Sequence, residues 1–187
     1  MKEVKLTQGY IVLVDDEDFE RVSKFSWVPN RMKHTVYAQR NLYREDGKRT
    51  TQSLQRFILG ITNHKTDVDH EDHNGLNCQK YNLRISTRSQ NQANSVLPIT
   101  NSSGVKGVYK YASKAWKTCD KWKAQINFKG KKKSLGYFSS KEEAQAAYDK
   151  VAVELFGEFA LTNEKIKSGI VAQSGERLPC TQEAVGA

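Results

Sequence analysis

The N-terminal third of the chain alternates between short apolar stretches and polar turns, a pattern typical of β-structure. The apolar stretch 11–14 reads as one arm of a hairpin, and strands are expected on both sides of Asp46-Gly47, a strong hairpin-turn signal, at 35–43 and after Lys48. Two short helices are expected within the same part. The first, within 15–25, has acids at its start, and the second, 54–59, lies between a capping Ser53 and Gly60. We therefore expect residues 1–66 to form a β-rich segment.

Residues 67–96 carry a shorter, more polar pattern. Two short strands, 68–70 and 83–86, enclose a polar loop with an Asn74-Gly75 turn. Thr87 is a suitable N-cap for a helix from Arg88 to about Val96. The expected unit is therefore two strands followed by a helix.

A run of turn-forming residues, 97–103, reads as a linker to a second unit, 104–163. Three strands are expected in that unit, at 107–111, 122–128 and 132–138. A helix should follow, because Ser139 and Ser140 precede two glutamates and an apolar stripe from Ala144 to Leu155 repeats at helical spacing. Such a helix would cover one face of the sheet. Residues 164–187 have no hydrophobic period, and we expect a disordered tail there.

Charge is concentrated in the second unit. The 187 residues carry a net charge of +9, and the stretch 106–133 holds ten lysines against one acid, Asp120. Such a positive field attracts polyanions, of which DNA and RNA are the commonest in the cytosol. A solvated lysine face that only aids solubility is the alternative. No apolar stretch is long enough for a membrane span and no signal peptide is evident, and the three scattered cysteines favour a reducing compartment, so we expect a cytoplasmic protein.

Four residues between 69 and 91 combine the groups needed to hydrolyse a phosphodiester. Asp69 and Asn91 offer oxygen donors of the kind that Mg²⁺ prefers. His70, on the opposite side of an extended strand from Asp69, can accept a proton near neutral pH. Each of these residues, and Asn82, could alternatively be an ordinary turn or cap residue.

The order Asp69-His70, Asn82 twelve residues after the histidine, and Asn91 nine residues further on resembles the HNH nuclease motif. The resemblance implies a ββα-metal unit around one Mg²⁺ or Mn²⁺ ion per active site. In that family His70 matches the general base, Asp69 and Asn91 the metal ligands, and Asn82 the asparagine that braces the loop and orients the histidine. Arg84, in the matching Asn-Leu-Arg segment, is a candidate phosphate contact.

Residues 104–163 resemble the APETALA2 DNA-binding domain of plant ethylene-response factors, which also occurs in many HNH homing nucleases. The resemblance rests on the segments Lys106-Gly107-Val108, 121–126, 135–138, 142–144, 147–149 and 156–163. In that family the three-stranded sheet enters the major groove. Strand alternation predicts an outward, DNA-contacting face and an inward face packed on the helix. The outward face consists of Lys106, Tyr109, Tyr111, Lys123, Gln125, Asn127, Lys132 and Ser134.

The sequence thus predicts an α+β protein: a ββα-metal unit preceded by a β-rich segment and followed by a three-stranded antiparallel sheet packed on one helix. The function expected is that of a metal-dependent DNA endonuclease of the homing type. Its partner is double-stranded DNA, with no membrane and no small-molecule substrate, and the chain is expected to act as a monomer. The alternatives are a non-catalytic DNA-binding regulator and a protein that binds or cuts RNA.

Overall fold

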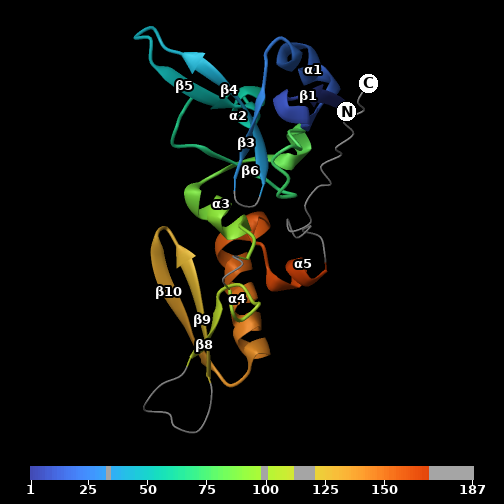
Figure 1. Ribbon diagram of the computed structural model, residues 1–187. Coiled ribbons are helices and arrows are strands. Elements are labelled where there is room, and N and C mark those ends of the chain that lie inside the picture. Colours follow the sequence, from blue (N-terminus) through green and yellow to red (C-terminus); the bar gives the residue numbers. More distant parts are fainter. Residues whose placement is uncertain (33–34, 98–100, 112–120, 169–187) are drawn as a thin grey trace.

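The computed structural model describes residues 1–32, 35–97, 101–111 and 121–168, and it combines helices and strands in an α+β arrangement (Figure 1). Four small antiparallel sheets account for all its strands in the described part. No helix in that part is both long and apolar enough to cross a bilayer. Lysines 114 and 117 of the basic stretch lie outside the described residues.

The N-terminal part contains two of these sheets. One pairs β1 (Lys2–Lys5) with β2 (Ile11–Val14), joined by the short 3₁₀ turn η1 (Thr7–Gly9), and the other has the order β3-β4-β5. The expected helices are present as α1 and α2. The bounds are α1 (Asp16–Ser23), β3 (Val28–Arg31), β4 (Val36–Tyr43), β5 (Arg49–Ser53) and α2 (Leu54–Ile58). No local pattern predicted β1, and Pro29 argued against a strand at β3. Within the described residues β3 is an edge strand paired with β4, so it tolerates a residue without an N–H.

One hydrophobic core spans this part and continues into the following unit. Trp27, 1% exposed, and Leu54 lie in it together with Cys78 and Leu83 from beyond residue 66. The backbone joins the two as well, since Leu13 donates its N–H to Leu76 O at 2.8 Å and accepts from Cys78 N at 2.9 Å. A unit of some thirty residues has too little interior to be stable alone. The expected boundary after residue 66 therefore does not separate two cores.

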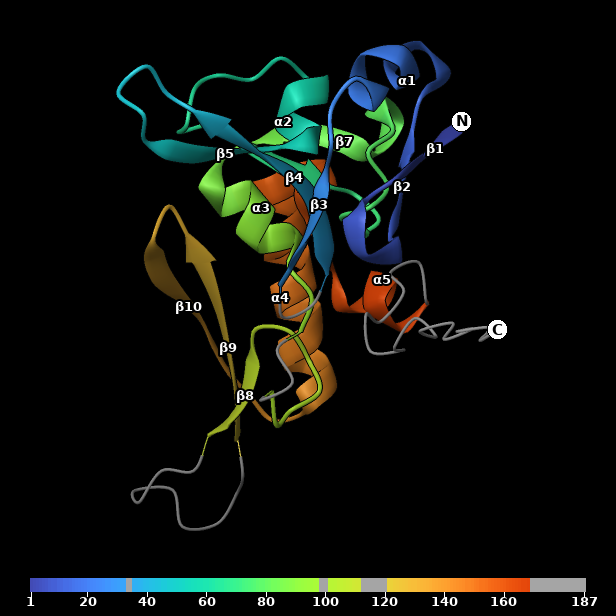
Figure 2. The same cartoon turned by 45° about the horizontal axis from the view of Figure 1, so that its top comes forward.

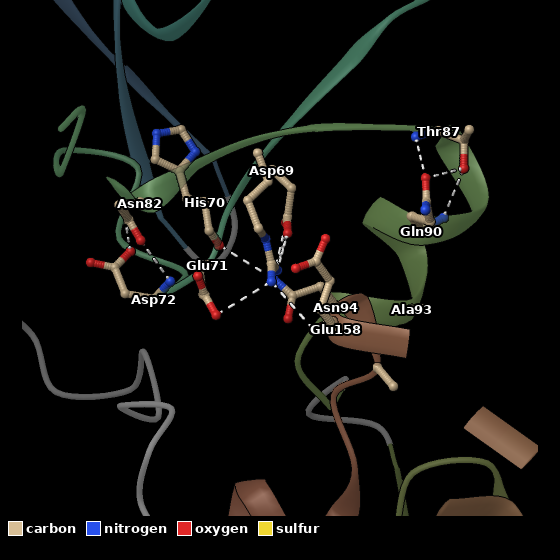
Figure 3. Close-up of polar contacts among 12 residues, drawn as sticks. Asp69, His70, Glu71, Asp72, Asn82, Thr87, Gln90, Ala93, Asn94 and Glu158 are labelled. Atoms are coloured by element: carbon tan, nitrogen blue, oxygen red, sulfur yellow. Dashed lines mark hydrogen bonds and ion pairs between the residues drawn. The ribbon is translucent and has the colours of Figure 1, made fainter. Parts of the chain in front are cut away.

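The central unit consists of a two-stranded antiparallel sheet, β6 (Asp67–His70) and β7 (Leu83–Ser86), followed by α3 (Arg88–Asn94). The turn η2 (Lys80–Asn82) precedes β7. Thr87 caps α3 as expected, because its side chain accepts from Gln90 N while the Gln90 side chain accepts from Thr87 N at 2.9 Å (Figure 3). This strand–strand–helix order matches the expected one, with the helix ending two residues earlier.

The C-terminal part is a three-stranded antiparallel sheet, in the order β10-β9-β8, packed on a long helix. Its elements are β8 (Val108–Tyr111), β9 (Lys121–Phe128), β10 (Lys131–Phe138) and α4 (Lys141–Phe156), which begins at the Ser140 cap. Ala124 and Ile126 are buried against Ala144, Tyr148 and Ala152 of the helix. Gly107, at φ +73°, lies against Tyr148, and a Cβ there would come within 2.1 Å of the ring. This packing follows from the alternation within β9.

Helix α3 joins the two parts, and both ribbon views place it between them (Figures 1 and 2). Ala93 is buried in the core of the C-terminal part, and its carbonyl accepts from Leu161 N at 3.4 Å. Ser89 at the other end of α3 accepts from Lys129 N at 3.0 Å. The C-terminal part is therefore held against α3 by contacts near both ends of the helix.

The expectation of a disordered tail from residue 164 is wrong at its start. After the turn η3 (Gly157–Phe159), a short helix α5 (Asn163–Lys167) is capped by Thr162, whose side chain accepts from Lys165 N. Asn163 is buried and donates to Asp149 at 2.8 and 2.9 Å. A helix of five residues is too short to show a hydrophobic period. Residues 169–187 lie outside the described residues.

Candidate functional site

Asp69 lies on β6 and is buried, with its side chain 6% exposed, between a helix and a neighbouring strand. Asn94 of α3 donates to both carboxylate oxygens, at 3.0 and 2.9 Å. Arg84 of β7 donates to Oδ2 at 2.5 Å. Figure 3 shows the carboxylate turned toward Asn94 and the His70 ring directed elsewhere, as expected for successive residues of a strand. The charge of Asp69 is thus balanced within the protein.

Arg84 connects this carboxylate to the C-terminal part. Its guanidinium also lies 3.4 Å from Glu71, donates to the carbonyl of Glu158 at 3.3 Å and sits 4.5 Å from the centre of the Phe159 ring. The side chain is only 12% exposed. A contact between Arg84 and phosphate, as the sequence suggested, would have to be shared with these protein partners.

His70 is buried, and its surroundings keep it neutral. Its Nε2 lies 3.8 Å from Cys78 Sγ, and its ring centre lies 5.5 Å from that of Tyr37. Burial lowers the pKa of His70 to about 4, although the nearby carboxylates of Asp72 and Asp69 oppose this. Burial also raises the pKa of Cys78 to about 12, so the neighbouring thiol is neutral. At neutral pH His70 therefore has a free nitrogen lone pair that can accept a proton.

Asn82 holds together the loop between β6 and β7. Its side chain accepts from Asp72 N at 3.0 Å and donates to Asp72 Oδ1 at 2.8 Å (Figure 3). It also donates to Asn77 O at 2.8 Å. Its carbonyl accepts from Glu71 N, next to His70, at 3.0 Å. These bonds brace the loop, one part of the role expected for Asn82. They reach His70 through the backbone of the loop.

A cavity of about 180 Å³ brings three of the four expected residues together. Asp69, His70 and Asn91 line it, whereas Asn82 lies in the loop behind. His73 lines it as well. Burial lowers the pKa of His73, and the Asp69 carboxylate opposes this shift only in part. The remaining walls come from β4, β6 and the end of α3, and include Thr35, Tyr37, Val68, Asn94, Ser95 and Val96.

The cavity suits a hard divalent cation by its donor types and its size. Asp69 and Asn91 offer a carboxylate and an amide, and a volume of about 180 Å³ leaves room for several waters of about 30 Å³ each. Among the described residues, no three His, Cys, Asp or Glu side chains are grouped so as to hold a metal ion. A site here would therefore need amide oxygen or water in addition to any carboxylate or imidazole ligand.

The residues expected on the outward face of the sheet share one side of it, except Lys106, which precedes β8 and donates to carbonyls of α3. Directly paired residues of antiparallel strands point to the same face. Lys123 is opposite Tyr109, Gln125 is opposite Ser134, and Asn127 is opposite Lys132. A bulge between Ser134 and Gly136 also brings Tyr137 opposite Lys123 on this face. Tyr111 reaches it too, with its ring centre 4.8 Å from that of Tyr137.

A groove of about 510 Å³ runs between this face and the end of α3. Five of the expected residues line it, namely Lys106, Tyr109, Gln125, Asn127 and Lys132. The Lys106 ammonium points to α3, where it donates to Ala93 O at 2.5 Å and Ser95 O at 2.7 Å. Burial lowers the pKa of Lys106 to about 7. Ser95 and Val96 line both this groove and the smaller cavity, so the two hollows are neighbours.

Sequence reasoning missed three residues at these sites. Asn94 could have been predicted, because it lies three residues after Asn91 and therefore on the same face of α3. Tyr37 comes from β4, thirty-three residues before His70, and no local pattern connects the two. Tyr137 was not among the residues predicted for the outward face, because a bulge reverses the alternation expected for a regular strand.

One curated protein is similar to this chain over most of its length. It is a protein of Acanthamoeba polyphaga mimivirus named as an uncharacterized HNH endonuclease, with 31% identity over 162 residues. The similarity covers 84% of this chain and 76% of the viral protein. No family model matches the chain, and no solved structure does.

Proposed function

The chain belongs to the HNH endonuclease family, and on that premise we propose that it is a metal-dependent endonuclease of the homing type that hydrolyses phosphodiester bonds in duplex DNA. The observation that carries this proposal is the cavity shared by Asp69, His70 and Asn91. It collects a carboxylate and a neutral imidazole from β6 and an amide from α3. Hydrolysis of a phosphodiester needs these groups together.

In this proposal each residue has a separate task. His70 accepts the proton of the attacking water. With the Nε2 proton directed at Cys78, the Nδ1 lone pair would be the free one. Asp69 and Asn91 would hold one Mg²⁺ or Mn²⁺ ion, which when bound offsets the negative charge developing on the 3′ oxygen as it leaves. Because water attacks phosphorus, the products carry 5′-phosphate and 3′-hydroxyl ends.

In this proposal the C-terminal part binds the DNA, as an APETALA2-type domain does. Its exposed face offers tyrosines, amides and lysines, and Tyr109 is 47% exposed. Lysine binds phosphate as a point charge and lacks the two-pronged geometry with which arginine reads guanine. We therefore expect this face to contribute more to affinity than to discrimination among sequences. The adjoining groove and cavity would let one duplex reach both.

The proposal predicts that the full chain converts supercoiled plasmid to nicked or linear forms when Mg²⁺ or Mn²⁺ is present. Removal of the cation with a chelator should stop the reaction, and its return should restore it, because the carboxylate and amide alone cannot offset charge on the leaving oxygen. Gel electrophoresis measures the conversion. Sealing of the nicks by a DNA ligase checks for 5′-phosphate and 3′-hydroxyl ends. Cleavage that persists in chelator would contradict the role given to Asp69 and Asn91.

A second prediction concerns Lys132, which is exposed and lies opposite Asn127. Replacing it with alanine should weaken binding to duplexes of every sequence and lower the salt slope of log K by about one, since one phosphate contact is lost. Fluorescence anisotropy at several salt concentrations measures this. Lys150→Ala is the matched control, because Lys150 is also exposed but lies on α4. Equal slopes for both variants would exclude the sheet face as the contact.

One observation favours the alternative of a DNA-binding protein without catalysis. The Asp69 carboxylate is already occupied by Arg84 and Asn94, and a fixed guanidinium repels a cation. If the plasmid stays intact with either cation while the duplex is still bound, this alternative holds.

A further inference from the structure

His73 has an unusual backbone conformation for its residue type. It lies at φ +62°, in the left-handed region, directly after the turn that follows β6. Its N–H donates to His70 O at 3.1 Å, and the bonds from Asn82 to Asp72 fix the turn. Residues other than glycine adopt this conformation at a cost of order 1–3 kcal/mol, although histidine tolerates it better than most. Glycine at this position would avoid that cost. The presence of a histidine instead therefore needs an explanation in terms of its side chain.

Burial of the His73 ring has a second free-energy cost. Its Nε2 is buried and has no hydrogen-bond partner among the described residues. An unpaired polar atom in such a position costs about 1–3 kcal/mol. A histidine that only completes a turn would have its ring in solvent, as exposed His64 does. The orphaned nitrogen instead belongs to a residue that lines the cavity of Asp69 and Asn91.

The donors around this cavity suit a cation that accepts nitrogen as well as oxygen. Among the described residues, Asp69 Oδ1 accepts a hydrogen bond from Asn94 alone, so a lone pair remains for a ligand there. Asn91 reaches the cavity from α3, and His73 reaches it from the loop after β6. Mg²⁺ prefers oxygen ligands, whereas Mn²⁺, Co²⁺ and Ni²⁺ bind imidazole increasingly well.

We propose that His73 is a third ligand of the cation held by Asp69 and Asn91, so that this site favours Co²⁺ and Mn²⁺ over Mg²⁺. The inference rests on the proposed function, because it assumes that a cation binds at Asp69. It adds a residue outside the four positions of the nuclease motif. A bound cation would satisfy the unpaired nitrogen of His73, a residue that lines the cavity.

The test is cation binding by the full chain, measured by titration calorimetry and by the visible absorption of Co²⁺. The main variant is His73→Gly, which keeps the positive φ without strain and removes the ring. Its affinity for Co²⁺ should fall at least about tenfold, the lower limit for residues that merely orient a ligand. Its affinity for Mg²⁺ should change little. The absorption band should move to longer wavelength, because water replaces nitrogen.

Two further variants make the result decisive. In His73→Asn the new residue also tolerates a positive φ, but it offers an amide oxygen in place of the imidazole nitrogen. This variant should therefore bind Mg²⁺ relatively better and Co²⁺ relatively worse than the wild type. His64→Gly is the matched control and should leave both affinities and the absorption band unchanged. Thermal unfolding checks that His73→Gly is folded, and its midpoint should not drop.

The outcomes separate this inference from the proposed function. If Asp69→Asn weakens Co²⁺ binding and His73→Gly does not, the cation site stands and the role of His73 is overturned. If Asp69→Asn leaves binding unchanged as well, no cation is held at Asp69 and the metal site of the proposed function fails. Loss of Co²⁺ affinity in both variants, with the control unaffected, supports the inference.

Discussion

Replacing His70 with alanine is expected to slow cleavage of supercoiled plasmid by about 10²–10⁴-fold, the contribution typical of a positioned general base. The imidazole is the group proposed to take the proton from the attacking water, and its pKa, lowered to about 4 by burial, keeps it unprotonated at neutral pH. DNA affinity should stay the same, because the sheet face is untouched. Initial rates of nicking at saturating cation measure the effect.

The matched control for this prediction is His64→Ala, since His64 is exposed and lies outside the cavity. It should cleave at the wild-type rate. Because His70 is buried, thermal unfolding must show that the His70 variant is folded under the assay conditions. A folded His70 variant that cleaves within a few-fold of the wild type would remove the proposed base from the mechanism.

The second large effect concerns stability. Replacing Arg84 with methionine is expected to lower the free energy of unfolding by about 3–5 kcal/mol in the absence of divalent cations, because it leaves a buried carboxylate without its counter-charge. The side chains of Arg84 and Asp69 are only 12% and 6% exposed. Methionine keeps most of the volume beside Phe159, so the change reports mainly on charge. Urea unfolding measures the loss.

A double-mutant cycle isolates the pair. The Asp69→Asn/Arg84→Met double variant should lose less than the sum of the two single variants, by about 0.5–3 kcal/mol. Mg²⁺ should stabilise Arg84→Met more than the wild type, since a cation can then neutralise Asp69 in place of the guanidinium. Arg88→Met is the matched control. Arg88 lies 3.9 Å from Asp67 but is 82% exposed, and its loss should stay within about 0.5 kcal/mol.

Elements with a strong local signal were predictable from the sequence. Thr87 and Ser140 cap their helices as expected, and Asp46-Gly47 forms the turn between β4 and β5. In each case the residues that decide the structure are within four positions of one another. Caps and tight turns depend on neighbours in the sequence, so sequence patterns reveal them.

The features that were missed depend on contacts between distant segments. Leu13 pairs with Asn77, and this contact joins the N-terminal segment to the central unit. No sequence pattern in either segment predicts the pairing. The ring of Tyr37 beside His70 and the contact of Arg84 with Phe159 arise in the same way. The sequence could therefore indicate which groups do chemistry, but the surroundings that set their charge and pKa became visible only in the folded chain.

The attachment of the sheet to α3 has a consequence for where DNA would be cut. Lys106 fastens the sheet to the carbonyls of Ala93 and Ser95, on the same helix that carries Asn91. Under the proposed function, the base pairs touched by the sheet and the scissile phosphate are thereby kept at a constant separation. Breaks mapped on many substrates would then fall at one fixed offset from the contacted sequence, with little scatter along the duplex.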